Sequence, residues 1–142
     1  MAETTLPTEI HLDIVTPDRL VTHDAVTGVT IPGKNGYLGI LPGHAPLLTE
    51  LAPGDLEYTS GGAIHTLAVN WGFAEVLPDR VIVLAQSAER AEEINVERAE
   101  KAKSRAEERL KRFTDPQVDM ERARQALLRA MARLQAAHRL RR

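Results

Sequence analysis

The chain has 142 residues, a formal net charge of -2 at pH 7 and no cysteine. This length suits one compact domain with an appendage, and the lack of thiols excludes disulfides, thiolate metal sites and thiol nucleophiles. No stretch approaches the roughly 18 consecutive apolar residues of a membrane-spanning helix, and the acidic, Thr-rich start lacks the pattern of a secretory signal. We therefore expect a soluble protein that remains in the cytosol and is stabilised by packing.

The charge is unevenly distributed along the chain. Residues 1–90 contain 4 basic and 11 acidic residues, whereas residues 91–142 contain 14 basic and 9 acidic residues. From Met120 onward the only acid is Glu121. A basic tail of this kind indicates an acidic partner. Its arginines are Arg122, Arg124, Arg129, Arg133, Arg139, Arg141 and Arg142.

Up to about residue 87, short apolar segments alternate with turn residues, which is typical of β-strands. Asn35-Gly36 is a strong hairpin signal, Ser60-Gly61-Gly62 supplies left-handed positions for a second turn, and Pro78-Asp79 suits a third. Short strands joined by such turns predict an antiparallel sandwich or barrel. The apolar segments are residues 10–15, 26–31, 38–41, 56–59, 64–69, 72–77 and 81–84.

From Ala91 onward the pattern becomes helical, because glycine is absent and Ala, Glu, Arg, Lys and Leu dominate. Asn95 is the predicted N-cap of a first helix, and Asp115 followed by Pro116 predicts the start of a second. A break at residues 113–115 then gives a helical hairpin. The predicted contact faces are Ala99, Ala102, Ala106, Leu110 and Phe113 in the first helix, and Met120, Ala123, Leu127, Ala130, Leu134 and Ala137 in the second.

These contact faces are mostly alanine, and each alanine removes little apolar area from water at roughly 25 cal/mol per Å2. We therefore expect a marginally stable hairpin that can populate docked and extended states. The alternative is a hairpin that stays docked permanently. The predicted domains are a β-sandwich at residues 1–88 and a two-helix hairpin at residues 89–142.

The run GYLGILPGHAPLL, residues 36–48, resembles the signature loop of the epsilon subunits of bacterial F-type ATP synthases. LDIVTP at residues 12–17 resembles the first strand of that family, while EVLPDRV at 75–81 and SAERAE at 87–92 resemble its last strands and hinge. The resemblance covers essentially the whole chain. It implies a β-sandwich of about ten short antiparallel strands followed by an antiparallel helical hairpin, in agreement with the prediction from the residues themselves.

The resemblance also implies a function. It indicates a non-catalytic rotor subunit in the central stalk of a proton-translocating F-type ATP synthase. The sandwich would hold the gamma shaft against the ring of c subunits, and the mobile hairpin would inhibit ATP hydrolysis by reaching between alpha, beta and gamma. Such a subunit is peripheral on the cytoplasmic side of the bacterial inner or plasma membrane, and it needs no cofactor, membrane span or nucleic acid.

Five residues at the predicted hairpin tip and signature loop are candidates for contact with the c ring and gamma. Tyr37 could anchor such a contact or be an ordinary surface tyrosine. His44 has no histidine, cysteine or carboxylate nearby at a metal-ligand or triad spacing, so a structural or interface role is expected. The candidates are Lys34, Asn35, Gly36, Tyr37 and His44.

Residues 94–99, INVERA, resemble the Ile-Asp-x-x-Arg-Ala motif of family members whose hairpin binds ATP, with Asn95 at the aspartate position. Arginines one helical turn apart can converge on phosphates. The resemblance therefore implies a regulatory ATP site, although Asn95 could simply cap a helix and the arginines could be solvated. The candidate ATP contacts are Glu89, Ile94, Asn95, Arg98, Arg129 and Arg133.

The basic second helix is also expected to reach an acidic segment of the beta subunits when the hairpin extends, because opposite charges favour docking. In this state the inhibition of ATP hydrolysis would be mechanical, and no residue would need to be catalytic. The candidate beta-subunit contacts are Arg122, Arg124, Arg129 and Arg133.

Two other classes of protein were compared with this hypothesis. A nucleic-acid binder could carry a basic helix, but the predicted sandwich is acidic and lacks aromatics interleaved with basic residues. A small ligand-binding or enzymatic sandwich needs a polar constellation, whereas the histidines lack any metal-binding spacing. Trp71, the only tryptophan, suits either a core or an interface. The remaining histidines are His11, His23, His65 and His138.

Overall fold

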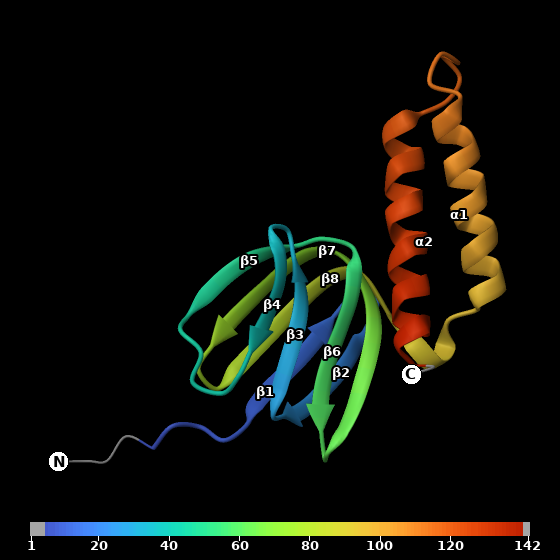
Figure 1. Ribbon diagram of the computed structural model, residues 1–142. Coiled ribbons are helices and arrows are strands. Elements are labelled where there is room, and N and C mark those ends of the chain that lie inside the picture. The colour runs from blue at the N-terminus through green and yellow to red at the C-terminus, as the bar shows by residue number, and fades with distance from the viewer. Residues whose placement is uncertain (1–4, 141–142) are drawn as a thin grey trace.

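The structure is a computed structural model that describes residues 5–140. A β-sandwich forms the first part and a two-helix hairpin stands beside it (Figure 1), as predicted. The strands are β1 (Ile10–Val15), β2 (Leu20–Val26), β3 (Gly28–Gly33), β4 (Gly36–Ile40), β5 (Leu47–Leu51), β6 (Gly54–Ser60), β7 (Ala63–Leu77) and β8 (Arg80–Arg90). The helices are the 3-10 turn η1 (Ala91–Glu93), α1 (Val96–Lys111) and α2 (Met120–Leu140).

The strands form a continuous sheet that folds over on itself. Its order is β2-β1-β8-β7-β5-β3-β4, and β6 pairs with both β3 and β7. All pairs are antiparallel except β1 with β8, which are parallel. Strands β3, β4 and β6 form one layer, β2, β1 and β8 form the other, and β5 and β7 connect the two (Figure 1).

The described residues form eight strands, compared with the about ten that the resemblance implied. Two of the apolar segments predicted from the sequence are one strand, whereas β5 was not among the predicted segments. Residues 64–69 and 72–77 both belong to β7, which bends where Trp71 and Gly72 have φ of 23° and 147°. The β7–β8 register is the same on both sides of this bend, with Asn70 opposite Ser87 and Gly72 opposite Ala85, and the pairing skips Trp71. The part of β7 before the bend pairs with β6, and the part after it pairs with β5.

The predicted turns are present, one of them shifted by a residue. Gly61 and Gly62 have φ of 58° and 78°, as the left-handed prediction required, and residues 78–79 form the β7–β8 turn. The Asn35-Gly36 prediction was wrong by one position, because the turn residues are Lys34 and Asn35 and Gly36 begins β4. Gly36, with φ of 132°, pairs with Gly33 as the first residue pair of the hairpin, so it belongs to the strand and not to the turn.

The main core lies between the two layers. It is built from alternate residues of the strands, such as Ile10, Leu12 and Ile14 of β1, which are completely buried. This alternation follows from the two-residue period of a strand. The other fully buried large side chains are Val26, Ile31, Ile40, Leu56, Leu67, Val69, Val76, Val81 and Val83.

The start of α1 was predicted correctly and the start of α2 was not. Asn95 caps α1, since its side-chain oxygen accepts a hydrogen bond from the backbone N–H of Arg98 at 3.0 Å. Asp115 instead stabilises a turn through the N–H of Gln117, and Asp119 accepts from the N–H of Arg122 at the start of α2. Aspartate is a common capping residue in both turns and helices. Here the first aspartate begins a turn, so the residues after it are not helical and the helix begins after the second one.

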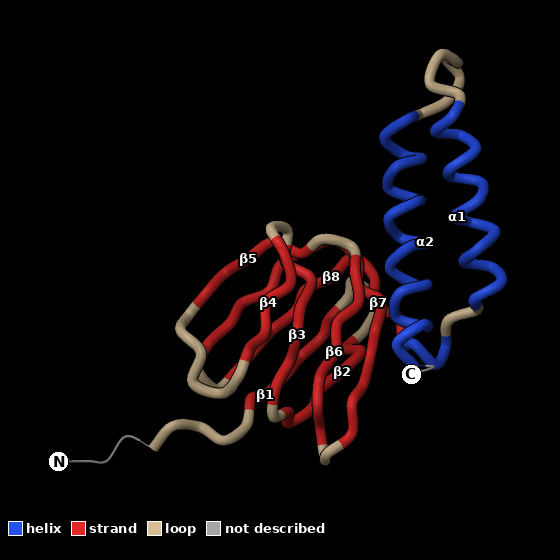
Figure 2. Tube along the Cα trace, viewed as in Figure 1, coloured by secondary structure: helices blue, strands red, loops and turns tan. Residues whose placement is uncertain are grey.

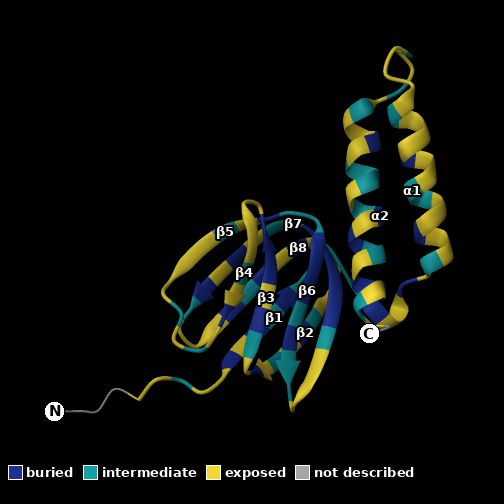
Figure 3. Cartoon of the chain, viewed as in Figure 1, coloured by how far each residue is buried: buried dark blue, intermediate teal, exposed yellow. Residues whose placement is uncertain are grey.

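Helix α2 packs on the sandwich against β6 and β7, and α1 packs on α2 (Figure 1). Alanine dominates both contacts, as predicted for the seam between the helices, and the outer sides of the hairpin are exposed (Figure 3). The loop at residues 112–119 lies at the end of the hairpin away from the sandwich (Figure 2). The buried alanines along the helix–helix seam are Ala99, Ala106, Ala123, Ala130 and Ala137. A second buried group contains Ala132 and Ala136 with Ala68, Ala91 and Ile94.

Within the described part of the chain, no helix combines the length and the apolar character needed to cross a bilayer. Arg141 and Arg142, which complete the basic tail in the sequence, lie outside the described residues.

Candidate functional site

A hollow of about 330 Å3 lies where the base of the hairpin meets the end of β8. Four of the six candidate ATP contacts line it: Glu89, Asn95, Arg98 and Arg133. Glu89 and Arg133 form an ion pair across it, with Arg133 Nε 2.9 Å from Glu89 Oε2. The remaining lining residues are Glu93, Ala99, Ala102 and Arg105. Three arginines and two glutamates therefore surround one open space.

The structure places the other two candidate ATP contacts outside this lining. Ile94 is buried in a cluster with Ala136. The guanidinium of Arg129 lies 5.8 Å from the centre of the Trp71 ring, in a cation–π contact with the sandwich. Arg105 was missed from the sequence, although it lies seven residues after Arg98 and therefore on the same face of α1.

The tip of the β3–β4 hairpin is exposed, and its side chains contact neighbouring strands. Lys34 Nζ lies 2.9 Å from Glu50 Oε2, and this hydrogen bond raises the pKa of Lys34 above its ordinary value. The Tyr37 hydroxyl donates to Asp55 Oδ1 at 2.5 Å. Partial burial and this hydrogen bond raise the pKa of Tyr37 to about 12. Tyr37 is 50% exposed, so one side of its ring is available to a partner.

His44 lies within the signature run, in the loop between β4 and β5. Its Nδ1 is 2.6 Å from the carbonyl oxygen of Ala45, and its backbone N–H donates to the carbonyl of Leu41. Both contacts are made within the loop itself. Across residues 5–140, His, Asp and Glu do not gather in threes as a metal site would require.

A second charged cluster joins the C-terminal end of α2 to β6. Asp55, whose side chain is 2% exposed, forms an ion pair with Arg139 Nε. Arg139 also donates to Glu57 Oε1 at 2.7 Å. Sequence reasoning missed this cluster, because Arg139 and the two carboxylates are far apart in the sequence and meet only when α2 packs on β6. The available signal was their spacing of two residues, which places both carboxylates on one face of β6.

An apolar row crosses the outer face of the β2-β1-β8-β7 layer and was also missed from the sequence. Adjacent strands bring Leu20, Val15, Leu84 and Phe73 into register one after another. Leu20, Leu84 and Phe73 are 55, 53 and 50% exposed. Exposed apolar side chains that lie side by side mark an interaction surface more strongly than scattered ones. This apolar row is therefore a candidate protein interface.

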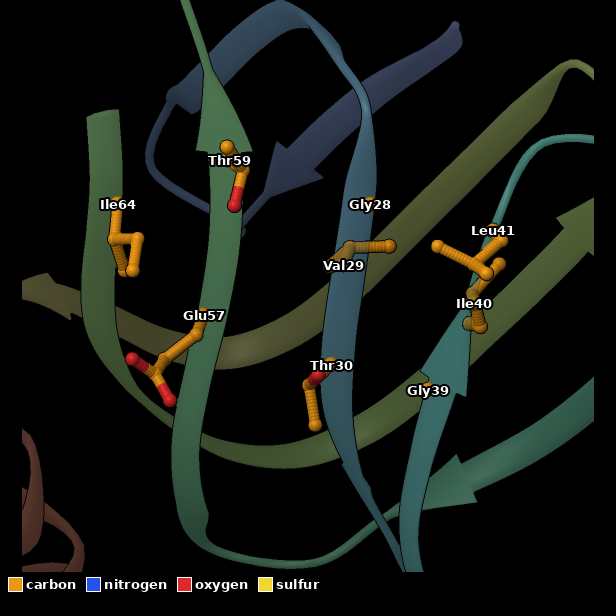
Figure 4. A pocket seen from close by; sticks show the side chains of 9 residues that line it. All are labelled: Gly28, Val29, Thr30, Gly39, Ile40, Leu41, Glu57, Thr59 and Ile64. Carbon is orange, nitrogen blue, oxygen red and sulfur yellow. The ribbon is translucent and has the colours of Figure 1, made fainter. Parts of the chain in front are cut away.

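A shallow groove of about 400 Å3 crosses the opposite layer over β3. Figure 4 shows Gly28 and Thr30 on its floor, between Glu57 on one side and Leu41 on the other. Gly39 pairs regularly with Thr30, and a Cβ there would meet no atom within 4 Å. The lining holds one carboxylate and no basic group, so it offers nothing to bind phosphates.

The four candidate beta-subunit contacts fall into two groups. Arg129 and Arg133 face the sandwich and are engaged with Trp71 and Glu89. Arg122 and Arg124 are exposed near the start of α2, and Arg124 pairs only with Glu121 of its own helix, at 2.8 Å. In the docked arrangement, two of the four arginines are therefore occupied by contacts with the sandwich.

Comparison with known proteins identifies two adjoining family domains. The ATP synthase delta/epsilon chain beta-sandwich domain matches residues 9–91, and the delta/epsilon chain long alpha-helix domain matches residues 92–138. Together these matches span both parts of the structure.

Individual relatives are named ATP synthase epsilon chains. The ATP synthase epsilon chain of Koribacter versatilis is 63% identical over 98 residues, which are 69% of each chain. That of Nitratidesulfovibrio vulgaris is 51% identical over 125 residues, 88% of this chain and 92% of the relative. Among solved structures, a chain of the Euglena gracilis mitochondrial ATP synthase, OSCP/F1/c-ring, superposes with a TM-score of 0.82 at 28% identity, covering 92% of this chain and 82% of that one.

Proposed function

This chain belongs to the ATP synthase delta/epsilon chain family, and from that membership we propose how its two parts divide the work of a rotor subunit. The chain is a non-catalytic subunit of the central stalk of F-type ATP synthase. The sandwich couples the c ring to the gamma subunit, and the hairpin is a brake on ATP hydrolysis. A nucleic-acid binder and a small ligand-binding sandwich are not favoured.

The apolar row is the surface that we assign to gamma. A permanent partner in a rotor must transmit torque, which requires an interface with an apolar centre rather than isolated surface charges. Leu20, Leu84 and Phe73 provide such a centre on strands that are fixed by the core. The hairpin tip with Lys34 and Tyr37, together with the loop holding His44, is then assigned to the polar loops of the c ring.

The hairpin is assigned to the brake. Its docking on the sandwich rests on small alanine contacts and on a few charged pairs, such as Arg133 with Glu89. Contacts of this kind gain little free energy per residue, so an extended state can compete with the docked one. In the extended state, Arg122, Arg124, Arg129 and Arg133 become available to an acidic segment of the beta subunits.

ATP is assigned to the hollow at the base of the hairpin, where it would favour the docked state. A ligand that binds only one of two states stabilises that state by its binding free energy. Arg98, Arg105 and Arg133 supply the positive charge for phosphates. Because Asn95 already caps α1, it can accept a further hydrogen bond but contributes no charge.

The assignment of the apolar row is tested by binding to the isolated gamma subunit of the same enzyme. Phe73→Glu should abolish binding, because it places a charge in the middle of the buried surface. Ile64→Glu is the matched control, since Ile64 is 68% exposed on the same strand but lies in the groove of the other layer. Equal binding by both variants would overturn the assignment of this face.

A further inference from the structure

Asp55 occupies an unusual position on the sandwich. Its neighbours in sequence, Leu56 and Tyr58, belong to the core, so Asp55 and Glu57 lie on the outer face of β6. The side chain of Asp55 is nevertheless only 2% exposed. Its burial therefore comes from what covers the outer face of β6, which includes α2. When α2 leaves, Asp55 returns to water.

Arg139, near the end of α2, provides the positive charge for this buried carboxylate. It pairs with Asp55 through Nε and donates to Glu57 at 2.7 Å. Breaking a buried ion pair by removing one partner is strongly unfavourable, because an uncompensated charge remains. Arg139 is thus a specific lock for the last turns of α2, in addition to the apolar contacts of Ala132 and Ala136.

The other oxygen of Asp55 is bound by a different element. Tyr37 of β4 donates its hydroxyl to Asp55 Oδ1 at 2.5 Å. Gly54 makes room for this contact, since a Cβ there would lie 2.9 Å from the Tyr37 hydroxyl and 2.7 Å from Pro32 Cβ. One carboxylate therefore connects the β3–β4 hairpin with the C-terminal end of α2.

We propose that Asp55 is a latch that couples the position of Tyr37 to the docking of α2 through Arg139. In the docked state Asp55 is shielded from water, so loss of the Tyr37 hydroxyl leaves it short of a donor. In the undocked state water replaces that donor at little cost. A partner that displaces Tyr37 therefore releases the hairpin. This inference rests on the proposed function, in which the β3–β4 hairpin faces the c ring and the helical hairpin is a brake.

The latch can be tested on the full isolated chain, whose lack of cysteine allows two labels to be placed freely. Spin labels at Asp18→Cys and Ser104→Cys, both exposed, report the distance between sandwich and hairpin during a urea titration. Arg139→Gln should raise the ratio of undocked to docked chains about tenfold or more. Tyr37→Phe should raise it about fivefold, because one hydrogen bond to a buried charge is lost.

Arg124→Gln is the matched control, because it is the same substitution in the same helix and removes only a pair within α2. It should leave the ratio unchanged. In the Arg139→Gln background, Tyr37→Phe should have less effect than in the wild type, since the two contacts share Asp55. Hydrogen exchange of residues 132–140 extends the measurement to openings that are too rare for the spin labels.

Two results would overturn the latch. One is docking by Arg139→Gln that equals docking by Arg124→Gln. The other is an equal effect of Tyr37→Phe with and without Arg139, which would make the two contacts independent. The measurement contains no other subunit, so it is separate from the gamma-binding test. Loss of the latch would leave the assignment of the apolar row intact, and the reverse also holds.

Discussion

Arg133 Nε lies 2.9 Å from Glu89 Oε2, so the middle of α2 is tied to the end of β8. Both side chains are about one-third exposed, at 37 and 34%. The ion pair is therefore screened by water and contributes little to docking on its own. Its position matters more than its strength, because the same arginine faces the hollow assigned to ATP.

Calorimetric titration of ATP into the isolated chain should show binding at one site. Asn95→Asp should tighten it, since aspartate caps α1 as well as asparagine and is a stronger acceptor for the hydroxyl and amino groups of the nucleotide. Arg133→Gln should weaken it about tenfold or more, because a charge-assisted contact to phosphate is lost.

Arg124→Gln again serves as the control for the ATP titration, because Arg124 does not line the hollow. Its affinity should match that of the wild type. If neither the wild type nor Asn95→Asp shows a heat of ATP binding, the ATP site is contradicted and the hairpin is a brake that does not respond to nucleotide.

Trp71 should report docking without any label. It is the only tryptophan, and the Arg129 guanidinium lies 5.8 Å from the centre of its ring. Arg129→Gln should change the emission of Trp71 and weaken docking by about 0.5–1 kcal/mol, which is typical of an exposed cation–π contact. The emission of Arg122→Gln should stay as in the wild type. Identical emission from all three proteins would mean that Arg129 does not lie over the ring in solution.

How much could be predicted from the sequence depended on whether a feature was local. The Asn95 cap and the turn at Gly61 and Gly62 are decided by a few adjacent residues, and both were predicted correctly. The start of α2 was not, because Asp115 and Asp119 carry the same capping signal and only the intervening turn separates them.

The non-local features could not be found in this way. The apolar row exists only because three strand pairings place Leu20, Leu84 and Phe73 side by side. The register between distant strands cannot be predicted from any single segment of the sequence. Asp55 likewise becomes a buried carboxylate only when α2 covers β6. The family resemblance supplied the function and most of the candidate ATP site, but it pointed to neither of these two features.

Gly72→Ala should destabilise the sandwich strongly. Gly72 has φ of 147°, and a Cβ there would lie 1.8 Å from the backbone oxygen of Leu84, so the bend in β7 could not form without moving β8. We expect a loss of about 3 kcal/mol or more in the free energy of unfolding, measured by urea. Gly39→Ala, which meets no atom within 4 Å, should be close to neutral. Equal stability of the two variants would contradict the close approach of Gly72 to the backbone of β8.

Alkaline titration should show the hydrogen bond of Tyr37. Burial and the hydrogen bond to Asp55 raise the pKa of Tyr37 from 10.0 to about 12. Because the folded-state pKa is the higher one, its contribution to stability is complete below pH 10 and is lost as the pH rises toward about 12. Ultraviolet absorbance should show a phase near pH 12 that disappears in Tyr37→Phe. In Asp55→Asn the phase should move to lower pH yet stay above 10, since burial remains.

The central claim, that the hairpin is a brake which must leave the sandwich to act, is tested most directly by locking it in place. Cysteines at Glu89→Cys and Arg133→Cys, whose native side chains face each other, can be joined by a short cleavable crosslinker in the full chain. The chain is then assembled with the other F1 subunits of its enzyme, and ATP hydrolysis is measured before and after cleavage. We predict fast hydrolysis with the hairpin locked and inhibition once the crosslink is cut. Equal inhibition in both conditions would contradict the account.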